Sequence, residues 1–266
     1  MMTTRRSFTR VLPVICGLLV AGCASSGTLS GDDPATWRCE AKTPLPSGSA
    51  VLWVRASAEY AALTRQIYSN ATAALRRLAR KERRGAWFVI MDADETLIDN
   101  SLYMAERRKC GLEFSAETWS QWVDEALAEA VPGGGAFVKA VHDAGGYVAI
   151  VTNRSDTKRE ATMAALEKNN IPVEALFLHA DGTPGDKSPR WREAGNAIAA
   201  TVGGKAPHPI MWVGDQISDL PRLGPDGTIL GPLDQSLRDA EASAFVLFGE
   251  RFIVLPNPLY GAWDKE

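Results

Sequence analysis

The chain has 266 residues, enough for one large domain or two modest ones, and its 45% hydrophobic and 23% charged residues match ordinary globular usage. This composition argues against a disordered chain or a coiled coil, and 23 Gly and 15 Pro are too few for a low-complexity sequence. The net charge of −3 offers no basic excess to neutralise nucleic-acid phosphates, so a nucleic-acid polymer is not an expected partner, and the 3 histidines lack the spacing of a multi-histidine zinc site.

Residues 1–22 have the features of an export signal. They contain three arginines and no acidic residue, and residues 11–22 form a short apolar run. These twelve residues would rise about 18 Å as a helix, whereas a bilayer core measures roughly 30 Å. We therefore predict that residues 1–22 are a signal peptide. Residues 4–8 (Thr-Arg-Arg-Ser-Phe) resemble a twin-arginine signal, although any basic segment of this kind also serves the general export route.

The sequence Val20-Ala21-Gly22-Cys23 resembles a lipobox, in which small residues precede a cysteine at the cleavage site. This resemblance implies that Cys23 is lipidated and anchors the exported protein to a membrane, in the periplasm or at the outer membrane. The alternative is that Cys23 is an ordinary cysteine of the leader.

Two further cysteines, Cys39 and Cys110, would remain in the mature chain. An exported protein meets an oxidising compartment, in which disulfides persist. If the two cysteines pair, the closed loop of about 70 residues would contribute on the order of 4 kcal/mol to stability. Two separate thiols are equally compatible with the sequence, because sequence does not show proximity.

The mature chain divides by composition into a tether and one domain. Residues 23–50 are rich in Ser, Gly, Pro, Asp and Thr, which predicts a lipidated tether with little to bury. Residues 51–84 contain no proline or glycine, and apolar residues recur three or four apart, which predicts a helix. Residues 86–266 form the predicted core, and the domain as a whole is predicted over residues 51–266.

Four apolar runs in the core are typical of buried parallel strands. They cover residues 87–91, 147–151, 176–178 and 210–213. Helix-compatible stretches separate them, at residues 135–144, 158–168 and 191–202. This alternation predicts a Rossmann-like α/β fold with a mainly parallel sheet and helices on both faces. Helical spacing between the first two strands predicts a small cap, an insert of about residues 100–132.

Polar side chains follow each predicted strand. The first strand leads to Asp92 and Asp94, the second to Thr152 and Asn153, the third to Lys187, and the fourth to Asp215 and Asp219. Open α/β sheets bind ligands at the carboxyl ends of their strands, so we expect these side chains to meet there. Each residue alone has an ordinary explanation, such as a helix cap for an aspartate or solvation for a lysine. The ordered set of four is far more specific.

The chemistry of this set points to phosphate. Several carboxylates in one crevice cannot all ionise without a counter-ion, and Mg²⁺ is the usual oxygen-ligated cation when phosphate is the substrate. The cation and Lys187 would flank a phosphoryl group, with the Thr152 hydroxyl as a further donor. A carboxylate can attack phosphorus to form an acyl-phosphate, and a second carboxylate two residues along can exchange the proton.

These motifs resemble those of the haloacid dehalogenase superfamily, and most closely its class C acid phosphatases, subfamily IIIB, which are surface lipoproteins. The likeness runs over nearly the whole mature chain. Its main motifs are Asp92-Ala93-Asp94-Glu95-Thr96, Asp99-Asn100-Ser101, Trp119-Ser120-Gln121-Trp122-Val123, Thr152-Asn153-Arg154, Asp186-Lys187-Ser188, Gly214-Asp215 and the tail Leu255–Trp263. Two departures are Ala93, where a larger apolar residue is usual, and the less acidic run Gln216–Asp219.

The resemblance implies a role for each matching position. Asp92 is the nucleophile and a metal ligand, and Asp94 is the general acid/base whose backbone carbonyl also ligates the metal. Thr152, Asn153 and Lys187 bind the phosphoryl group, Asp215 is the third protein ligand of the metal, and Asp219 is a supporting acid. Trp119 and Tyr260 match aromatic positions beside the leaving group. A core residue of the cap is the alternative reading for Trp119, and a structural tyrosine is the alternative for Tyr260.

The implied activity is that of an exported, Mg²⁺-dependent phosphomonoesterase that acts through an aspartyl-phosphate. Its expected substrates are small phosphomonoesters, in particular nucleoside 5′-monophosphates, and the resemblance implies a homodimer. Two alternatives stay open. A phosphotransferase would pass the phosphoryl group to an alcohol instead of water. A non-catalytic storage or binding lipoprotein would keep the fold alone, although both Asp92 and Asp94 are present.

Overall fold

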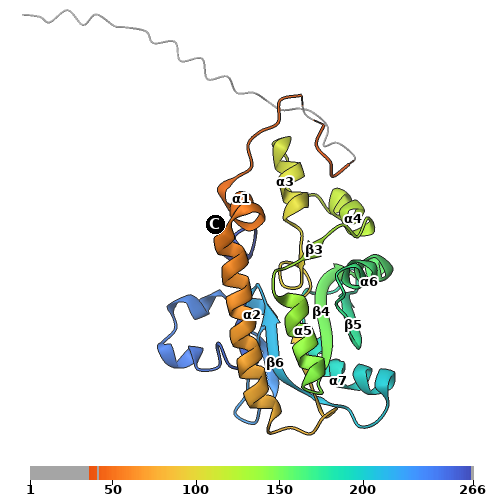
Figure 1. Ribbon diagram of the computed structural model, residues 1–266, viewed down its shortest axis with the longest axis vertical. Helices are drawn as coiled ribbons and strands as arrows, with labels where there is room; N and C mark the ends of the chain where they lie inside the picture. The colour runs from red at the N-terminus through yellow and green to blue at the C-terminus, as the bar shows by residue number, and fades with distance from the viewer. Residues whose placement is uncertain (1–35, 41, 265–266) are drawn as a thin grey trace, which may run out of the picture. The chain divides into compact units, whose positions relative to one another are not determined.

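The computed structural model describes residues 36–40 and 42–264, so the predicted signal peptide and Cys23 lie outside the described part of the chain (Figure 1). A five-stranded sheet forms the centre of the fold. In sequence order its strands are β1 (Trp87–Met91), β4 (Tyr147–Ser155), β5 (Ala175–His179), β6 (His208–Gly214) and β9 (Phe252–Val254). The spatial order is β5-β4-β1-β6-β9, and all neighbouring strands are parallel. The predicted α/β fold with a mainly parallel sheet is confirmed.

Helices cover both faces of the sheet. They are α1 (Ser49–Ala56), α2 (Ala58–Ala79), α3 (Ser101–Lys109), α4 (Ala116–Asp124), α5 (Gly134–Asp143), α6 (Arg159–Lys168) and α7 (Ser188–Val202). Along β1, Val89 packs in the core with α2, α5 and α6, and Phe88 packs in the core with α7. Because successive side chains of a strand point to opposite faces, both must be apolar, which explains the continuous apolar runs. Figure 1 shows α2 running alongside α5, and the two helices are in contact.

The single helix predicted over residues 51–84 is two helices in the structure. Ser57 interrupts it in an extended conformation, with φ −87° and ψ 138°. Its hydroxyl accepts a hydrogen bond from the backbone N–H of Tyr60 over 3.0 Å and so caps the start of α2. The apolar spacing continues through this break, so periodicity could not reveal it. Helix α2 then ends at Ala79, and the residues up to β1 form turns.

The segment before α1 also differs from the predicted tether. Trp37 is buried, and its ring lies edge-on to that of Trp122, with centroids 4.8 Å apart. Its Nε1 donates to Glu125 over 2.8 Å. Cys39 forms a disulfide with Cys110, with Cα atoms 5.7 Å apart, so the two thiols are not separate. One buried tryptophan and one disulfide are enough to attach this segment to the domain. Its composition is otherwise polar, so composition alone did not predict the contact.

The region between β1 and β4 corresponds to the predicted cap, and we use this name for residues 100–132. It holds α3 and α4, and the short antiparallel pair β2 (Ile98–Asp99) and β3 (Glu129–Ala130) lies at its base. A second antiparallel pair, β7 (Pro221–Leu223) and β8 (Ile229–Pro232), follows β6. Within residues 36–40 and 42–264, no helix combines the length and apolar character needed to cross a membrane.

Candidate active site

A cavity of about 440 Å³ lies where β1, β4 and β6 end, and residues of the cap form part of its wall. All nine site residues predicted within the described part of the chain line this cavity. They are Asp92, Asp94, Trp119, Thr152, Asn153, Lys187, Asp215, Asp219 and Tyr260. The structure therefore brings together residues from six separate regions of the sequence. It also adds cavity residues that the sequence argument did not single out, among them Met104, Phe114 and Arg154.

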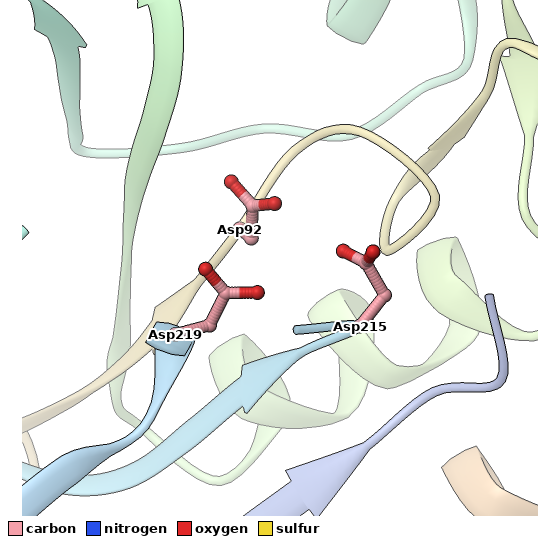
Figure 2. A group of neighbouring side chains, drawn as sticks. All are labelled: Asp92, Asp215 and Asp219. Carbon is pink, nitrogen blue, oxygen red and sulfur yellow. The ribbon is translucent and has the colours of Figure 1, made fainter. Parts of the chain in front are cut away.

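Three buried carboxylates converge at the base of the cavity. Asp92 follows β1, Asp215 follows β6, and Asp219 lies in the turn after it; each offers an oxygen within 4.8 Å of the others (Figure 2). Burial raises the pKa of Asp92 well above its ordinary value, with Lys187 opposing the shift and Asp219 adding to it. Burial and the charge of Asp219 likewise raise the pKa of Asp215 to about 6. The surrounding positive charge is thus too small to balance the ionised carboxylates of Asp92 and Asp215, so the cluster suits a bound cation.

The turn after β6 brings Asp219 back against the strand end. Its carboxylate accepts a hydrogen bond from the backbone N–H of Gln216 over 2.9 Å. A Cβ atom at position 214 would lie 2.3 Å from the Cβ of Asp219, so only the glycine present there permits this close approach. Gln216 also donates from its side chain to Asp215 over 2.7 Å.

Lys187 stands directly before α7 and supplies the positive charge of the site. Its Nζ lies 2.7 Å from Oδ1 of Asp92 and 2.6 Å from Oδ1 of Asp219. Burial by itself would lower the pKa of Lys187, but the charges of Asp219 and Asp92 outweigh burial and raise the pKa. The lysine is therefore charged and directed at the predicted nucleophile.

The carboxylate of Asp94 is not part of this cluster and pairs with Arg154. Nη2 of Arg154 lies 2.7 Å from Oδ1 of Asp94, and the arginine is 3% exposed. The side chain of Asn100 donates to the same oxygen over 2.7 Å. Sequence reasoning assigned no role to either residue, although both stand in the quoted motifs. Their signal would have been the demand of a partly buried carboxylate for hydrogen-bond donors.

Thr152 and Asn153 lie at the end of β4 and are held by Arg190. Nη1 of Arg190 donates to the carbonyl oxygen of Thr152 over 2.5 Å, and Nη2 donates to Oδ1 of Asn153 over 2.7 Å. The Thr152 hydroxyl is buried and accepts from the backbone N–H of Arg154 over 3.2 Å. These bonds fix the backbone of the predicted phosphate-binding segment.

The aromatic residues that line the cavity pack against neighbouring side chains and are also partly exposed to solvent. Trp119 is half-buried, and its ring lies edge-on to that of Tyr103, with centroids 5.2 Å apart. Phe114, between α3 and α4, is 58% exposed and packs 6.0 Å from Trp119. Phe114 was not predicted as a site residue, because it lies in a loop and loops have no regular spacing of apolar residues. The hydroxyl of Tyr260 donates to the buried Glu95, so this tyrosine has a structural bond as well as a ring at the cavity.

The comparisons with known proteins agree with this geometry. The sequence pattern of the haloacid dehalogenase (HAD) superfamily, subfamily IIIB (acid phosphatase), matches residues 34–263. Two solved structures resemble the fold over most of its length: the class C acid phosphatase from Bacillus anthracis, and the same enzyme with tungstate bound. Each has 28% sequence identity and a TM-score of 0.64, and the match covers 80% of this chain and 84% of the other. The chain therefore belongs to subfamily IIIB of the HAD superfamily, the acid phosphatases.

Proposed function

We propose that the protein is an exported, Mg²⁺-dependent acid phosphatase that hydrolyses small phosphomonoesters through an aspartyl-phosphate at Asp92. One observation carries the proposal. The Asp92 carboxylate faces Lys187 at 2.7 Å on the floor of a cavity that also holds Asp94, Asp215 and Asp219. A nucleophile, a cationic anchor, a second carboxylate and a cation-binding cluster are the groups that phosphoryl transfer through a carboxylate needs.

The residues present fit a hard divalent cation. Asp92 and Asp215 are buried oxygen donors with raised pKa values, and Gln216 and Asn257 hydrogen-bond to Asp215 and orient it. Asp92, Asp215 and the backbone carbonyl of Asp94 would hold Mg²⁺, with Asp219 as a supporting acid. The bound cation would neutralise charge on the phosphoryl oxygens.

The protein residues then carry the reaction in two steps. An oxygen of Asp92 forms a bond to phosphorus while the ester P–O bond breaks, and Asp94 gives its proton to the leaving oxygen. In the second step Asp94 takes a proton from water as the water oxygen attacks phosphorus, and the bond between phosphorus and Asp92 breaks. Lys187, Thr152 and Asn153 hold the phosphoryl oxygens throughout.

We propose nucleoside 5′-monophosphates as the substrate class. The cavity has the size of an ordinary small-ligand site, and its outer wall presents Phe114, Trp119 and Tyr260. Aromatic faces stack on nucleobases of any sequence, so they suit a base as part of the leaving group.

Export and anchoring complete the proposal. Residues 1–22 are the signal, and Cys23 is the lipid attachment site of a membrane-anchored, periplasmic or outer-membrane protein. The tether from Cys23 is shorter than residues 23–50, because the chain already packs at Trp37. The Cys39–Cys110 disulfide supports export, since disulfides persist in oxidising compartments. Family resemblance also supports a homodimer, which sedimentation would test. Cys23→Ser should release the protein from membranes, and retention of that variant would contradict the anchor.

The function is tested with protein that lacks residues 1–23. We expect it to release phosphate from p-nitrophenyl phosphate and from nucleoside 5′-monophosphates, with loss of activity in chelator and recovery on addition of Mg²⁺. The Asp92→Asn variant should fold and bind tungstate, an oxyanion similar to phosphate, but release no phosphate. Full activity in this variant would overturn the mechanism. Added alcohols distinguish hydrolysis from phosphotransfer through their phosphorylated products.

A further inference from the structure

The carboxylate of Asp94 is held by two side chains from different parts of the fold. Nε of Arg154, on β4, donates to both oxygens over 3.0 and 3.1 Å, and Nη2 donates to Oδ1 over 2.7 Å. Nδ2 of Asn100, directly before α3, donates to Oδ1 over 2.7 Å. This arrangement fixes both the position and the plane of the carboxylate, because a guanidinium offers its donors in a rigid fork.

Asn100 is itself fixed by the cap. Its side-chain oxygen accepts from Nε1 of Trp122, on α4, over 2.8 Å and from Nη2 of Arg154 over 3.2 Å. Its Nδ2 also donates to Oε1 of Glu95 over 3.1 Å. Asn100 is fully buried, and a flipped amide would place its NH₂ group against Nε1 of Trp122, which would then lose its acceptor. The carboxylate of Asp94 is thereby connected to a helix of the cap through Asn100 and Trp122.

A buried arginine is a poor choice for stability alone. Well-packed apolar side chains often stabilise a fold as well as a buried ion pair, because desolvation offsets much of the attraction. Geometry offers a better reason. A general acid must lie within hydrogen-bond reach of the atom that it protonates, and a displacement of about 1 Å can cost roughly 100-fold in rate.

We propose that Arg154 and Asn100 are positioning residues that aim the carboxyl group of Asp94 at the leaving oxygen, and that Trp122 maintains Asn100 in this role. The inference rests on the proposed function. The step concerned is the first one: the bond between an Asp92 oxygen and phosphorus forms, the ester P–O bond breaks, and the proton of Asp94 moves to the leaving oxygen.

The dependence of rate on the leaving group separates this role from a merely structural one. A phenol that leaves readily as an anion needs little protonation, whereas a poor leaving group depends on it. If Asp94 is no longer oriented correctly, the rate should therefore fall more for substrates with poor leaving groups than for substrates with good ones. Loss of fold or of phosphoryl binding should slow the whole series equally. The value of kcat/KM is the correct measure, because it includes the step in which the leaving group departs.

The experiment measures kcat/KM with Mg²⁺ for substituted phenyl phosphates, from p-nitrophenyl to methoxyphenyl, and for an alkyl phosphate. The variants are Arg154→Lys, which keeps the charge without the fork, and Trp122→Phe, which removes the hydrogen bond to Asn100 at a residue that is not among the described residues lining the cavity. Trp87→Phe is the matched control, because Trp87 is equally buried and its Nε1 has no hydrogen-bond partner among residues 36–40 and 42–264.

For Arg154→Lys we expect kcat/KM to fall about ten times more for the alkyl phosphate than for p-nitrophenyl phosphate. Trp122→Phe should show a smaller change of the same sign, and Trp87→Phe should keep the wild-type pattern. An equal fall across the series in Trp122→Phe and Arg154→Lys would overturn the inference alone. If Arg154→Lys does not fold, the inference is decided by comparing the leaving-group dependence of kcat/KM in Trp122→Phe with that in Trp87→Phe. A wild-type enzyme without phosphatase activity would instead overturn the proposed function, and this inference with it.

Discussion

Asn257, in the C-terminal tail, donates from Nδ2 to Oδ2 of Asp215 over 2.8 Å. The two residues are 42 positions apart, and the bond attaches the tail to a proposed ligand of the metal. Gln216 donates to the same oxygen and also to the carbonyl oxygen of Tyr260. The tail therefore contributes to the site by holding Asp215, in addition to placing Tyr260 at the cavity.

This bond predicts that Asn257→Ala weakens metal binding. Partners that orient a ligand typically account for about 10–100-fold in metal affinity or activity, so we expect roughly tenfold more Mg²⁺ for half-maximal activity. Calorimetric titration of Mg²⁺ would measure the same loss directly. Asn196→Ala is the control, because Asn196 is exposed on α7 and its side chain donates to the exposed Glu193 of the same helix. An unchanged Mg²⁺ requirement in Asn257→Ala would refute the orienting role.

Trp119→Ala should distinguish substrates by the size of their leaving group. Base stacking on an aromatic side chain is worth about 1–3 kcal/mol, which predicts a rise in KM of roughly tenfold or more for nucleoside monophosphates. A small phosphate without a ring, such as glycerol phosphate, should keep its KM. Trp119→Phe should recover most of the difference. Equal effects on both substrates would show that Trp119 serves the fold of the cap and not the substrate.

The Cys39–Cys110 disulfide predicts that reductant destabilises the protein. The cysteines are 71 residues apart in sequence, and a loop of this size corresponds to about 4 kcal/mol in the chain-entropy view. Denaturant unfolding with and without reductant measures the loss. The double variant Cys39→Ser and Cys110→Ser should match the reduced protein and show no response to reductant. A wild-type midpoint that reductant leaves unchanged would contradict the prediction.

The lowered pKa of Glu174 predicts part of the loss of protein stability at acidic pH. Burial alone would raise the pKa of Glu174, but hydrogen bonds from His142 and from the backbone N–H of Val148 outweigh burial and lower the pKa. A lowered pKa in the folded state means that the contribution of Glu174 is complete above its ordinary pKa, near 4.5, and is lost as pH falls below it. Glu174→Gln should therefore flatten the fall in thermal stability between about pH 5 and pH 3. An unchanged slope would contradict this assignment.

The sequence predicted the parts of the fold that repeat a simple physical pattern. The strands at residues 87–91 and 210–213 were visible because both faces of the sheet are covered, so every side chain had to be apolar. Asp92 and Asp215 were visible because they directly follow these strands, whereas Trp119 and Tyr260 were identified only from the family resemblance. The strand β9, Phe252–Val254, was not predicted.

Other features depend on contacts between distant residues, which one sequence does not reveal. Trp37 is buried only because Trp122 and Glu125 of the cap lie beside it. The pairing of Asp94 with Arg154 spans 60 residues, and that of Asp215 with Asn257 spans 42. The break at Ser57 has a local cause, a capping hydroxyl, but the apolar spacing on both sides is the same. Residues at strand ends were therefore easier to find than the residues that orient them.

The central claim is that Asp92 carries the phosphoryl group during turnover. The direct test is to quench the active enzyme during hydrolysis, reduce any acyl-phosphate with borohydride and examine the peptide around residue 92 by mass spectrometry. We expect the reduced, alcohol form of this side chain in the wild type with substrate and Mg²⁺, and none without substrate or in Asp92→Asn. Active enzyme that shows no reduction at Asp92, or reduction at another carboxylate, would contradict the account.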